Sequence, residues 1–328
     1  MLRAEVIEKL FDIIDETSML LSSELQTGYL RAMCDTCQNV IAQSILQSVE
    51  VETRQSLQDY YKDLEELEFA QEEIRKALQL AILKGLKADR LTNSTMTPDS
   101  IALIMSYLAS KFVKDFENKT IGDLAVGTGN LLTAVLNHLP SQPETIYGVE
   151  SDPDLIQVAY VLADMQEHGI QFYQQSSLKS LFIDPLDVII SDLPVEHMDQ
   201  SELSELDLSL ASKGCNYLPY LLIENQIKYL KPGGYGFYLI PNDLFNQEHS
   251  ADFHQLITSQ VNIQALLQMP TTLFKTDDLG KSLFVIQKHG ESVKPVKEVL
   301  VAPLPNLKDP KKFSQMLTRV EDWIAINK

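Results

Sequence analysis

The segment that most constrains the fold of this chain is Ile121–Leu132, which reads IGDLAVGTGNLL. Its first residues fit a short buried strand, Gly127 and Gly129 fit a tight turn, and an apolar helix follows. Glycine lets a backbone approach a ligand where a Cβ atom would clash, and a helix N-terminus offers free N–H groups. The segment therefore predicts a strand–turn–helix unit with a ligand site at its turn.

A carboxylate lies at the expected end of the next strand, in Tyr147–Glu150. About twenty residues after a glycine turn, such a group accepts hydrogen bonds from ribose hydroxyls, which predicts a nucleoside-containing cofactor. A dinucleotide fingerprint has a third glycine where this chain has Leu132, and Asp123 suits a cofactor that carries an ammonium and a sulfonium group. Both features favour S-adenosylmethionine over NAD, and so disfavour an NAD-dependent oxidoreductase.

Short β-rich runs alternate with helical segments from about residue 100 onwards. This alternation predicts βαβ units, and hence an α/β fold with a mostly parallel sheet. The expected strands are 120–124, 145–149, 170–173, 187–191, 236–240, 263–268 and 282–287. One more strand is expected at the end of 290–304, followed by a closing helix over 309–326.

Residues 1–92 are predicted to form an N-terminal helical domain. Apolar residues recur there at intervals of three and four, and no proline occurs before Pro98. Within it, 59–86 is expected to be one long amphipathic helix. Residues 93–328 form the second expected domain, of which 290–328 are a C-terminal extension.

The formal net charge of −19 constrains the partners of the chain. It opposes stand-alone binding of DNA through a basic surface, since phosphate neutralisation needs clustered Lys and Arg. No apolar run is long enough to cross a bilayer and no signal peptide is expected, so we predict no membrane partner. Three cysteines cannot form a disulfide framework, and Cys34 and Cys37 fit small buried helix residues. We therefore expect a cytoplasmic protein and assign no metal site.

Several short motifs occur in the order found in a known family. They are Thr97-Pro98, the DLAVGTGN of 123–130, the YGVE of 147–150, the SDLP of 191–194, the LKPGG of 230–234 and the LIPN of 239–242. In this order they resemble the N6-adenine DNA methyltransferases, especially the modification subunits of type I restriction systems. The chain is more similar still to small adenine-methylase-like proteins of Gram-positive bacteria. The resemblance implies a Rossmann-like class I methyltransferase fold, with a seven-stranded, mostly parallel sheet beside the helical domain.

The resemblance also implies which residues bind S-adenosylmethionine. Thr97 and Pro98 would hold its methionine end, and Glu150 its ribose. The nearest match to the acid that the family places against the adenine amino group is Ser176, whose hydroxyl accepts without charge assistance. The full expected set is Thr97, Pro98, Asp123, Ala125, Gly127, Thr128, Gly129, Asn130, Glu150, Ser151, Ser176, Ser177 and Asp192.

The catalytic motif of the family, Asn/Asp-Pro-Pro-aromatic, aligns with Asp192-Leu193-Pro194-Val195. By resemblance, the Asp192 side chain and the Leu193 carbonyl would accept hydrogen bonds from an exocyclic adenine amine and stabilise its developing charge. Leu193 replaces a proline, and Val195 lacks the aromatic face whose stacking is worth about 1–3 kcal/mol per base. Tyr217 or Tyr220 of the following loop are candidate replacements.

Eight acidic residues and no Lys or Arg lie between Lys179 and Lys213: Asp184, Asp187, Asp192, Glu196, Asp199, Glu202, Glu205 and Asp207. Such a segment repels phosphate, so DNA binding would need a protein partner or a metal ion. We predict an S-adenosylmethionine-dependent methyltransferase, and most specifically one that methylates adenine N6 in DNA. Two alternatives stay open: transfer to RNA, protein or a small molecule, and a catalytically weakened cofactor-binding module that acts through protein contacts.

Overall fold

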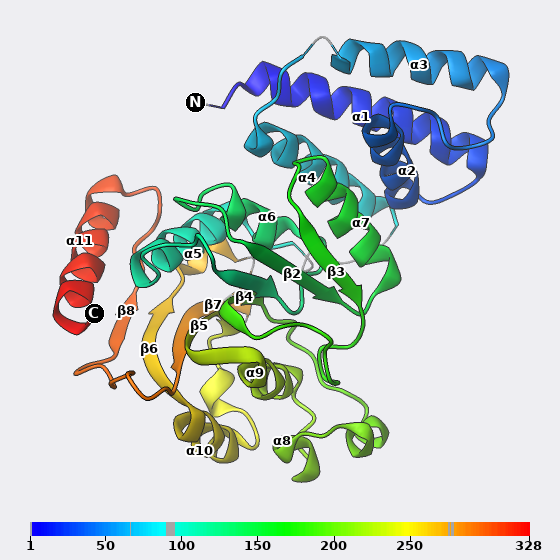
Figure 1. Cartoon of the computed structure of the whole chain (residues 1–328). Coiled ribbons are helices and arrows are strands. Elements are labelled where there is room, and N and C mark those ends of the chain that lie inside the picture. The colour runs from blue at the N-terminus through cyan, green and yellow to red at the C-terminus, as the bar shows by residue number, and fades with distance from the viewer. Residues whose placement is uncertain (1, 66, 90–95, 275, 277–278) are drawn as a thin grey trace.

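The computed structural model describes residues 2–65, 67–89, 96–274, 276 and 279–328. A sheet with the strand order β3-β2-β1-β4-β5-β7-β6-β8 forms its centre (Figure 1). The strands are β1 (Thr120–Asp123), β2 (Thr145–Glu150), β3 (Ile170–Gln174), β4 (Leu186–Asp192), β5 (Leu230–Pro241), β6 (Val261–Gln268), β7 (Lys281–Lys288) and β8 (Leu300–Pro303). Neighbouring strands run parallel except that β7 is antiparallel to both β5 and β6.

The predicted α/β class with a mostly parallel sheet is confirmed, but the sheet has eight strands rather than seven. The additional strand is β8, which pairs in parallel with β6 and places Leu300 opposite Ala265. It comes from the segment 290–304, where the sequence predicted one strand beyond the seven of the family fold. Leu300 and Ala302 point into the core, which explains why this edge position is stable.

Alternating side chains of the central strands bury both faces of the sheet. Phe237 of β5 packs on one face and Tyr238 on the other, as period-2 geometry requires. The first face is covered by α5 (Asp99–Phe112), α6 (Asn130–Leu136), α7 (Pro153–Asp164) and α11 (Pro310–Asn327). The second face is covered by α8 (Ser209–Ser212), α9 (Leu218–Tyr229) and α10 (Ser250–Gln260). Short 3₁₀ helices lie at Gln200–Glu205, Leu244–Asn246 and Thr271–Leu273.

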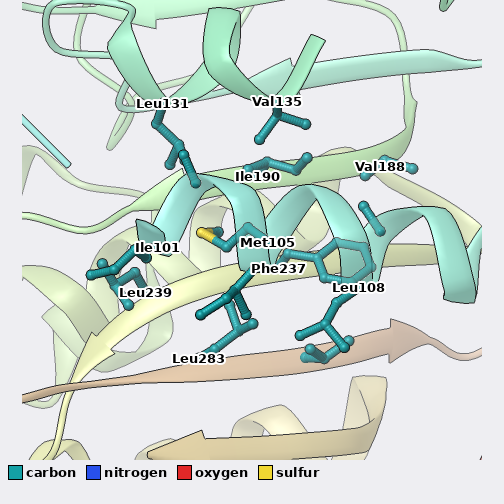
Figure 2. Packing of buried hydrophobic residues seen from close by; sticks show 14 of the residues in the cluster. Ile101, Met105, Leu108, Leu131, Val135, Val188, Ile190, Phe237, Leu239 and Leu283 are labelled. Atoms are coloured by element: carbon teal, nitrogen blue, oxygen red, sulfur yellow. The ribbon is translucent and has the colours of Figure 1, made fainter. Parts of the chain in front are cut away.

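Helix α5 is the centre of the first face. Figure 2 shows its residues Ile101, Met105 and Leu108 packed between α6 and the sheet, with Phe237 and Leu283 beneath them. This packing fixes the N-terminal end of α5, which follows Thr97 and Pro98 directly. None of the described helices is long and apolar enough to span a membrane.

The first four helices of the chain lie together at one end of the molecule (Figure 1). They are α1 (Ala4–Leu25), α2 (Tyr29–Ala42), α3 (Val51–Glu65) and α4 (Gln71–Ala88), and we call them the N-terminal helices. Helices α2 and α4 contact α7, and α4 also contacts α6. Cys34 and Cys37 are buried inside α2 as predicted, and burial raises the pKa of the Cys34 thiol to about 12.

The prediction of one helix over 59–86 is wrong, because α3 ends at Glu65 and α4 begins at Gln71. The Glu73 carboxylate, in the first turn of α4, accepts a hydrogen bond of 3.0 Å from the N–H of Ala70. Arg3 binds the same carboxylate oxygen at 2.6 Å. These contacts cap a new helix start, and they depend on a residue far away in the sequence.

Candidate functional site

A cleft of about 690 Å³ opens at the carboxyl ends of β1, β2, β3 and β4. The strand order reverses between β1 and β4, and parallel sheets bind ligands at such a switch point. The volume lies within the range of about 300–1,000 Å³ typical of small-molecule sites. Of the predicted site residues, those that line the cleft are Thr97, Asp123, Ala125, Gly127, Thr128, Asn130, Glu150, Ser151, Ser176, Ser177, Asp192, Leu193, Pro194 and Val195. Pro98 and Gly129 are the two that do not.

The two glycines of the turn have different roles. Gly127 has a φ of 54° and its N–H donates to Glu150 Oε2 at 2.9 Å, so the turn is tied to the end of β2. Gly129 has a φ of 78°, and a Cβ atom there would lie 3.2 Å from the Cα of Ala159 in α7. Gly129 therefore allows close packing of α6 against α7, whereas Gly127 faces the cleft.

The Glu150 carboxylate is held by backbone donors. Its Oε1 accepts the N–H groups of Ser151 at 2.7 Å and Asp152 at 2.9 Å, and its Oε2 accepts the N–H of Gly127. Ser151 Oγ also donates to Oε1 at 3.3 Å, whereas Oε2 has one donor, so the remaining acceptor capacity for a ligand in the cleft lies at Oε2. Glu150 is thus a fixed acceptor at the end of β2.

Asp123 is buried at the end of β1, with 1% of its surface exposed. Burial raises its pKa to about 7, and the negative charges of Asp192 and Glu150 act in the same direction. Hydrogen bonds from Ser191 Oγ at 2.7 Å and from the N–H of Ala125 at 3.0 Å oppose this shift. Near neutral pH this carboxyl exists in both protonation states, and an adjacent cation would favour the charged one.

Both oxygens of Asp192 have partners. Thr97 Oγ1 donates to Oδ2 at 2.8 Å, and Lys281 Nζ forms an ion pair with Oδ1. Lys281 is the first residue of β7. Neither Lys281 nor Ser191 was among the predicted site residues. The only local signal for Lys281 was its position at the start of an expected strand. The only local signal for Ser191 was its position next to Asp192 at the end of an expected strand.

The rest of the tetrapeptide turns partly inward. Leu193 is fully buried, and its N–H donates to the carbonyl of Leu239 at 3.2 Å. Pro194 is half-buried at the cleft, and Val195 is 47% exposed at its mouth. The mouth also contains Glu196, Met198, Leu218, Leu222 and Leu279.

Tyr217 and Tyr220 do not supply the aromatic face that Val195 lacks, so this hypothesis is wrong. Tyr220 stacks on Phe253 with ring centroids 4.1 Å apart, and Tyr217 contacts the edge of Tyr220 at 5.1 Å. Both tyrosines are buried in the cluster under α9 and α10, where their rings fill the core. In the described part of the chain, no aromatic side chain lines the cleft.

Three hydroxyl groups in the cleft test whether a polar cofactor fits there. Thr128 Oγ1 is buried and has no hydrogen-bond partner within the described structure. Ser176 Oγ accepts only the N–H of Leu178 at 3.3 Å among the bonds that the structure contains, while Ser177 Oγ donates to the carbonyl of Leu124. A buried hydroxyl without a partner is costly, so a polar ligand that bonds Thr128 fits this cleft.

Most acids of the acidic segment do not line the cleft. Of its eight acids, Asp192 and Glu196 line the cleft. Asp187 lies near the opposite end of β4, where Lys231 binds it at 2.6 Å. Glu205 pairs with Lys179 at 3.3 Å on the surface. The negative charge that the sequence assigned to the mouth is therefore spread over a wider surface.

Two family matches cover most of the chain. Residues 8–86 match the YtxK N-terminal helical domain, and residues 90–321 match the N-6 DNA Methylase family. The chain is 36% identical over 321 residues to the uncharacterized protein YtxK of Bacillus subtilis, covering 97% of each chain.

Solved structures show the same fold. A protein of Listeria monocytogenes, provisionally described as a class I S-adenosylmethionine-dependent methyltransferase, is 37% identical with a TM-score of 0.88. The match covers 98% of this chain and 100% of that chain. A type I restriction-modification methyltransferase subunit of Streptococcus thermophilus has a TM-score of 0.66 at 13% identity, covering 90% of this chain and 71% of that chain. The latter likeness concerns the fold alone.

Proposed function

Because the chain belongs to the N-6 DNA methylase family, we propose that it transfers a methyl group from S-adenosylmethionine to the exocyclic amine of adenine in DNA. The observation that supports this most strongly is the convergence of Asp123, Glu150 and Asp192 on one cleft. These three carboxylates come from the ends of three adjacent strands, β1, β2 and β4. Their arrangement separates a cofactor half from an acceptor half.

S-adenosylmethionine, when bound, supplies a methyl group on a sulfonium centre. In this proposal Glu150 accepts hydrogen bonds from the ribose hydroxyls, and Asp123 pairs with the ammonium of the methionine moiety. Thr128 Oγ1 and Ser176 Oγ offer hydrogen bonds to the remaining polar atoms, and Ser176 faces the adenine amino group. The aliphatic side chains of Val126 and Leu155, which also line the cleft, exclude water around the adenosine.

In the acceptor half, Asp192 accepts a hydrogen bond from the target amine, and the Leu193 carbonyl accepts the second. Positive charge that develops on the amine is stabilised by these oxygens. Thr97 fixes the Asp192 carboxylate through Oδ2, so Oδ1 is the oxygen that Lys281 and the amine share. The proton lost by the amine leaves toward this carboxylate.

The make-up of the mouth favours a second candidate, methyl transfer to an amine of a protein or a small molecule. A flipped base is normally held by stacking, and the described lining offers no aromatic side chain around Val195. Lys281 also places a cation beside the carboxylate that should meet the amine. Under the DNA proposal, a companion protein supplies the phosphate-binding surface, because the chain carries a net charge of −19.

Transfer of a tritiated methyl group distinguishes these candidates. Duplex DNA, single-stranded DNA, RNA, and the protein and small-molecule fractions of a lysate are each offered to the wild type, to Asp192→Ala and to Glu202→Ala. Glu202 is an exposed acid of the same segment that does not line the cleft, so it is the matched control.

We expect label in DNA adenine that falls at least a hundredfold in Asp192→Ala and stays unchanged in Glu202→Ala. Label confined to protein or to small molecules would establish the second candidate instead. Absence of S-adenosylmethionine binding at millimolar concentration would reject both.

A further inference from the structure

Arg75 of helix α4 is a charged residue almost completely buried between the N-terminal helices and the sheet, with 1% of its surface exposed. Its guanidinium pairs with Glu72 at 2.6 Å and Asp99 at 2.9 Å, and its Nη1 donates to Asn130 Oδ1 at 2.7 Å. A buried cation is tolerated only when its hydrogen bonds are satisfied, and here a planar fork meets three partners. Arg75 does not itself line the cleft.

Asn130 connects Arg75 to the cleft through two hydrogen bonds. It directly follows the glycine turn, at the start of α6, and it lines the cleft. Its Oδ1 accepts from Arg75, while its Nδ2 donates to the carbonyl of Thr97 at 3.0 Å. Both bonds are shielded from water because Asn130 is buried, which makes them costly to break.

Thr97 is held from its other side as well. Asp99, two residues later in the first turn of α5, binds Arg75, Lys76 and, at 2.9 Å, Gln79, all of α4. Burial opposes ionisation of Asp99, but the hydrogen bond from Lys76 and the charge of Arg75 outweigh it and lower the pKa of this carboxyl. Helix α4 therefore fixes the chain on both sides of the Thr97–Pro98 step.

The hydroxyl of Thr97 completes the connection, because Oγ1 donates to Asp192 Oδ2 at 2.8 Å. From α4 to the cleft, the residues bonded one to the next are Arg75, Asn130, Thr97, Asp192 and Lys281, and we call them the polar chain. It runs without interruption from the N-terminal helices to the carboxylate assigned to the methyl acceptor. Three of its four bonds join residues more than fifty positions apart in the sequence.

We propose that Arg75 is a positioning residue, which holds Thr97 through Asn130 and Asp99 and thereby aligns the Asp192 carboxylate for methyl transfer. The inference rests on the proposed methyltransferase function for its catalytic consequence. It gives the N-terminal helices a part in the reaction geometry, although none of their described residues lines the cleft itself. A misplacement of about 1 Å at a reacting group can cost about a hundredfold in rate.

The variants Arg75→Met and Arg75→Lys test this proposal against Gln71→Ala. Gln71 lies on the same helix and donates to the carbonyl of Gln166 at 2.7 Å, so its loss removes a contact between α4 and the rest of the chain without touching the polar chain. Arg75→Lys keeps the charge beside Glu72 and Asp99 but loses the planar fork, which guards against a variant that fails to fold.

For the acceptor that the wild type methylates, we expect kcat to fall ten- to hundredfold in Arg75→Met and less in Arg75→Lys. The Kd for S-adenosylmethionine should change by about threefold or less, since Glu150 and Asp123 keep their contacts, which do not involve the polar chain. Gln71→Ala should retain wild-type kcat. Equal losses of kcat in Arg75→Met and Gln71→Ala would overturn the proposal.

Hydrogen exchange of the cofactor-free protein gives a readout that does not depend on activity. The amides of Ile101, Thr133 and Leu193 lie close in sequence to Thr97, Asn130 and Asp192 of the polar chain, and each donates to a backbone carbonyl. We expect faster exchange in peptides covering all three in Arg75→Met, and in none of them in Gln71→Ala. Faster exchange confined to α4 and α7 would refute the positioning role, whether or not the wild type transfers a methyl group. Absence of methyl transfer by the wild type would refute the proposed function separately.

Discussion

The two halves of the cleft are built in different ways. In the cofactor half, Glu150 is held by three backbone N–H groups and Gly127 occupies a left-handed conformation that it can adopt without strain. In the acceptor half, Asp192 is held by two side chains, Thr97 and Lys281, which come from other parts of the sequence. Backbone geometry follows from the fold, whereas side-chain contacts change with single substitutions. The comparison teaches that the acceptor can diverge while cofactor binding is retained.

The largest effect is expected from the strongest contact of the cofactor half. Glu150→Ala removes the proposed ribose acceptor and also releases Gly127, so the Kd for S-adenosylmethionine should rise about a hundredfold in calorimetry. Asp154→Ala, at an exposed acid nearby at the start of α7, is the control and should bind normally. Binding that survives Glu150→Ala would remove the distinction between a backbone-fixed half and a variable half.

A substitution in the acceptor half should increase methyl transfer rather than weaken cofactor binding. Val195→Tyr restores an aromatic face at the exposed mouth, so methyl transfer to DNA should rise about tenfold or more. Val195→Leu is the control, since it adds apolar volume without a ring. A gain for a protein or small-molecule acceptor, with none for DNA, would assign the aliphatic mouth to that other class. The Kd for the cofactor should be the same in all three proteins.

The pH dependence of cofactor binding tests Asp123. Because burial raises its pKa to about 7, about a tenth of the carboxyl groups are ionised at pH 6 and about nine tenths at pH 8. A cofactor ammonium binds the ionised form, so affinity should rise about tenfold over this interval and release a proton on binding. Asp123→Asn should bind with an affinity that is lower than that of the wild type at pH 8 and independent of pH.

The same group predicts a change in the stability of the cofactor-free protein. Its folded pKa is raised above the ordinary value of 3.8, so the folded state binds the proton more tightly than the unfolded state. That stabilisation is complete below about pH 4 and is lost as the pH rises through 7. Chemical unfolding of the wild type and of Asp123→Asn across this range should show the loss in the wild type only.

The smallest effect separates the two glycines. Gly129→Ala forces a Cβ atom against Ala159 at a positive φ, which should lower the free energy of unfolding by about 1–3 kcal/mol. The Kd for S-adenosylmethionine should stay close to that of the wild type, because Gly129 does not line the cleft. Urea unfolding and calorimetry measure the two quantities. A strong loss of affinity at unchanged stability would show that Gly129 contributes to cofactor binding rather than to the packing of α6 against α7.

The parts of the site that could be predicted from sequence are those with a local signal. Gly127 and Glu150 each stand at the end of an apolar run, and the order of such runs indicates which strand ends meet at one edge. Lys281 could not be found in this way, because it reaches Asp192 only through the antiparallel position of β7 between β5 and β6. The start of α4 is likewise contacted by Arg3, which binds Glu73 from a position far away in the sequence.

The buried tyrosines illustrate a different limit. Tyr217 and Tyr220 follow the tetrapeptide closely enough to suggest a stacking surface, yet their rings complete the core beneath α9 and α10. A short separation in sequence shows that a side chain could reach the cleft, but not that it points toward it. Burial of a large ring in the core is favoured over its exposure at the mouth of a cleft. The acidic segment is similar, since composition gave its charge but not the side of the molecule that carries it.

The reversed direction of β7 has one more consequence. In a sheet of parallel strands, every strand delivers its last residue to the ligand edge, but β7 delivers its first, Lys281, together with Leu279 just before it. Residues that approach this edge from β7 belong to a connection separate from the one that carries the glycine turn. Substitutions at Leu279 and Lys281 therefore change the edge of the cleft at Asp192 without altering the segment that contains Gly127 and Glu150.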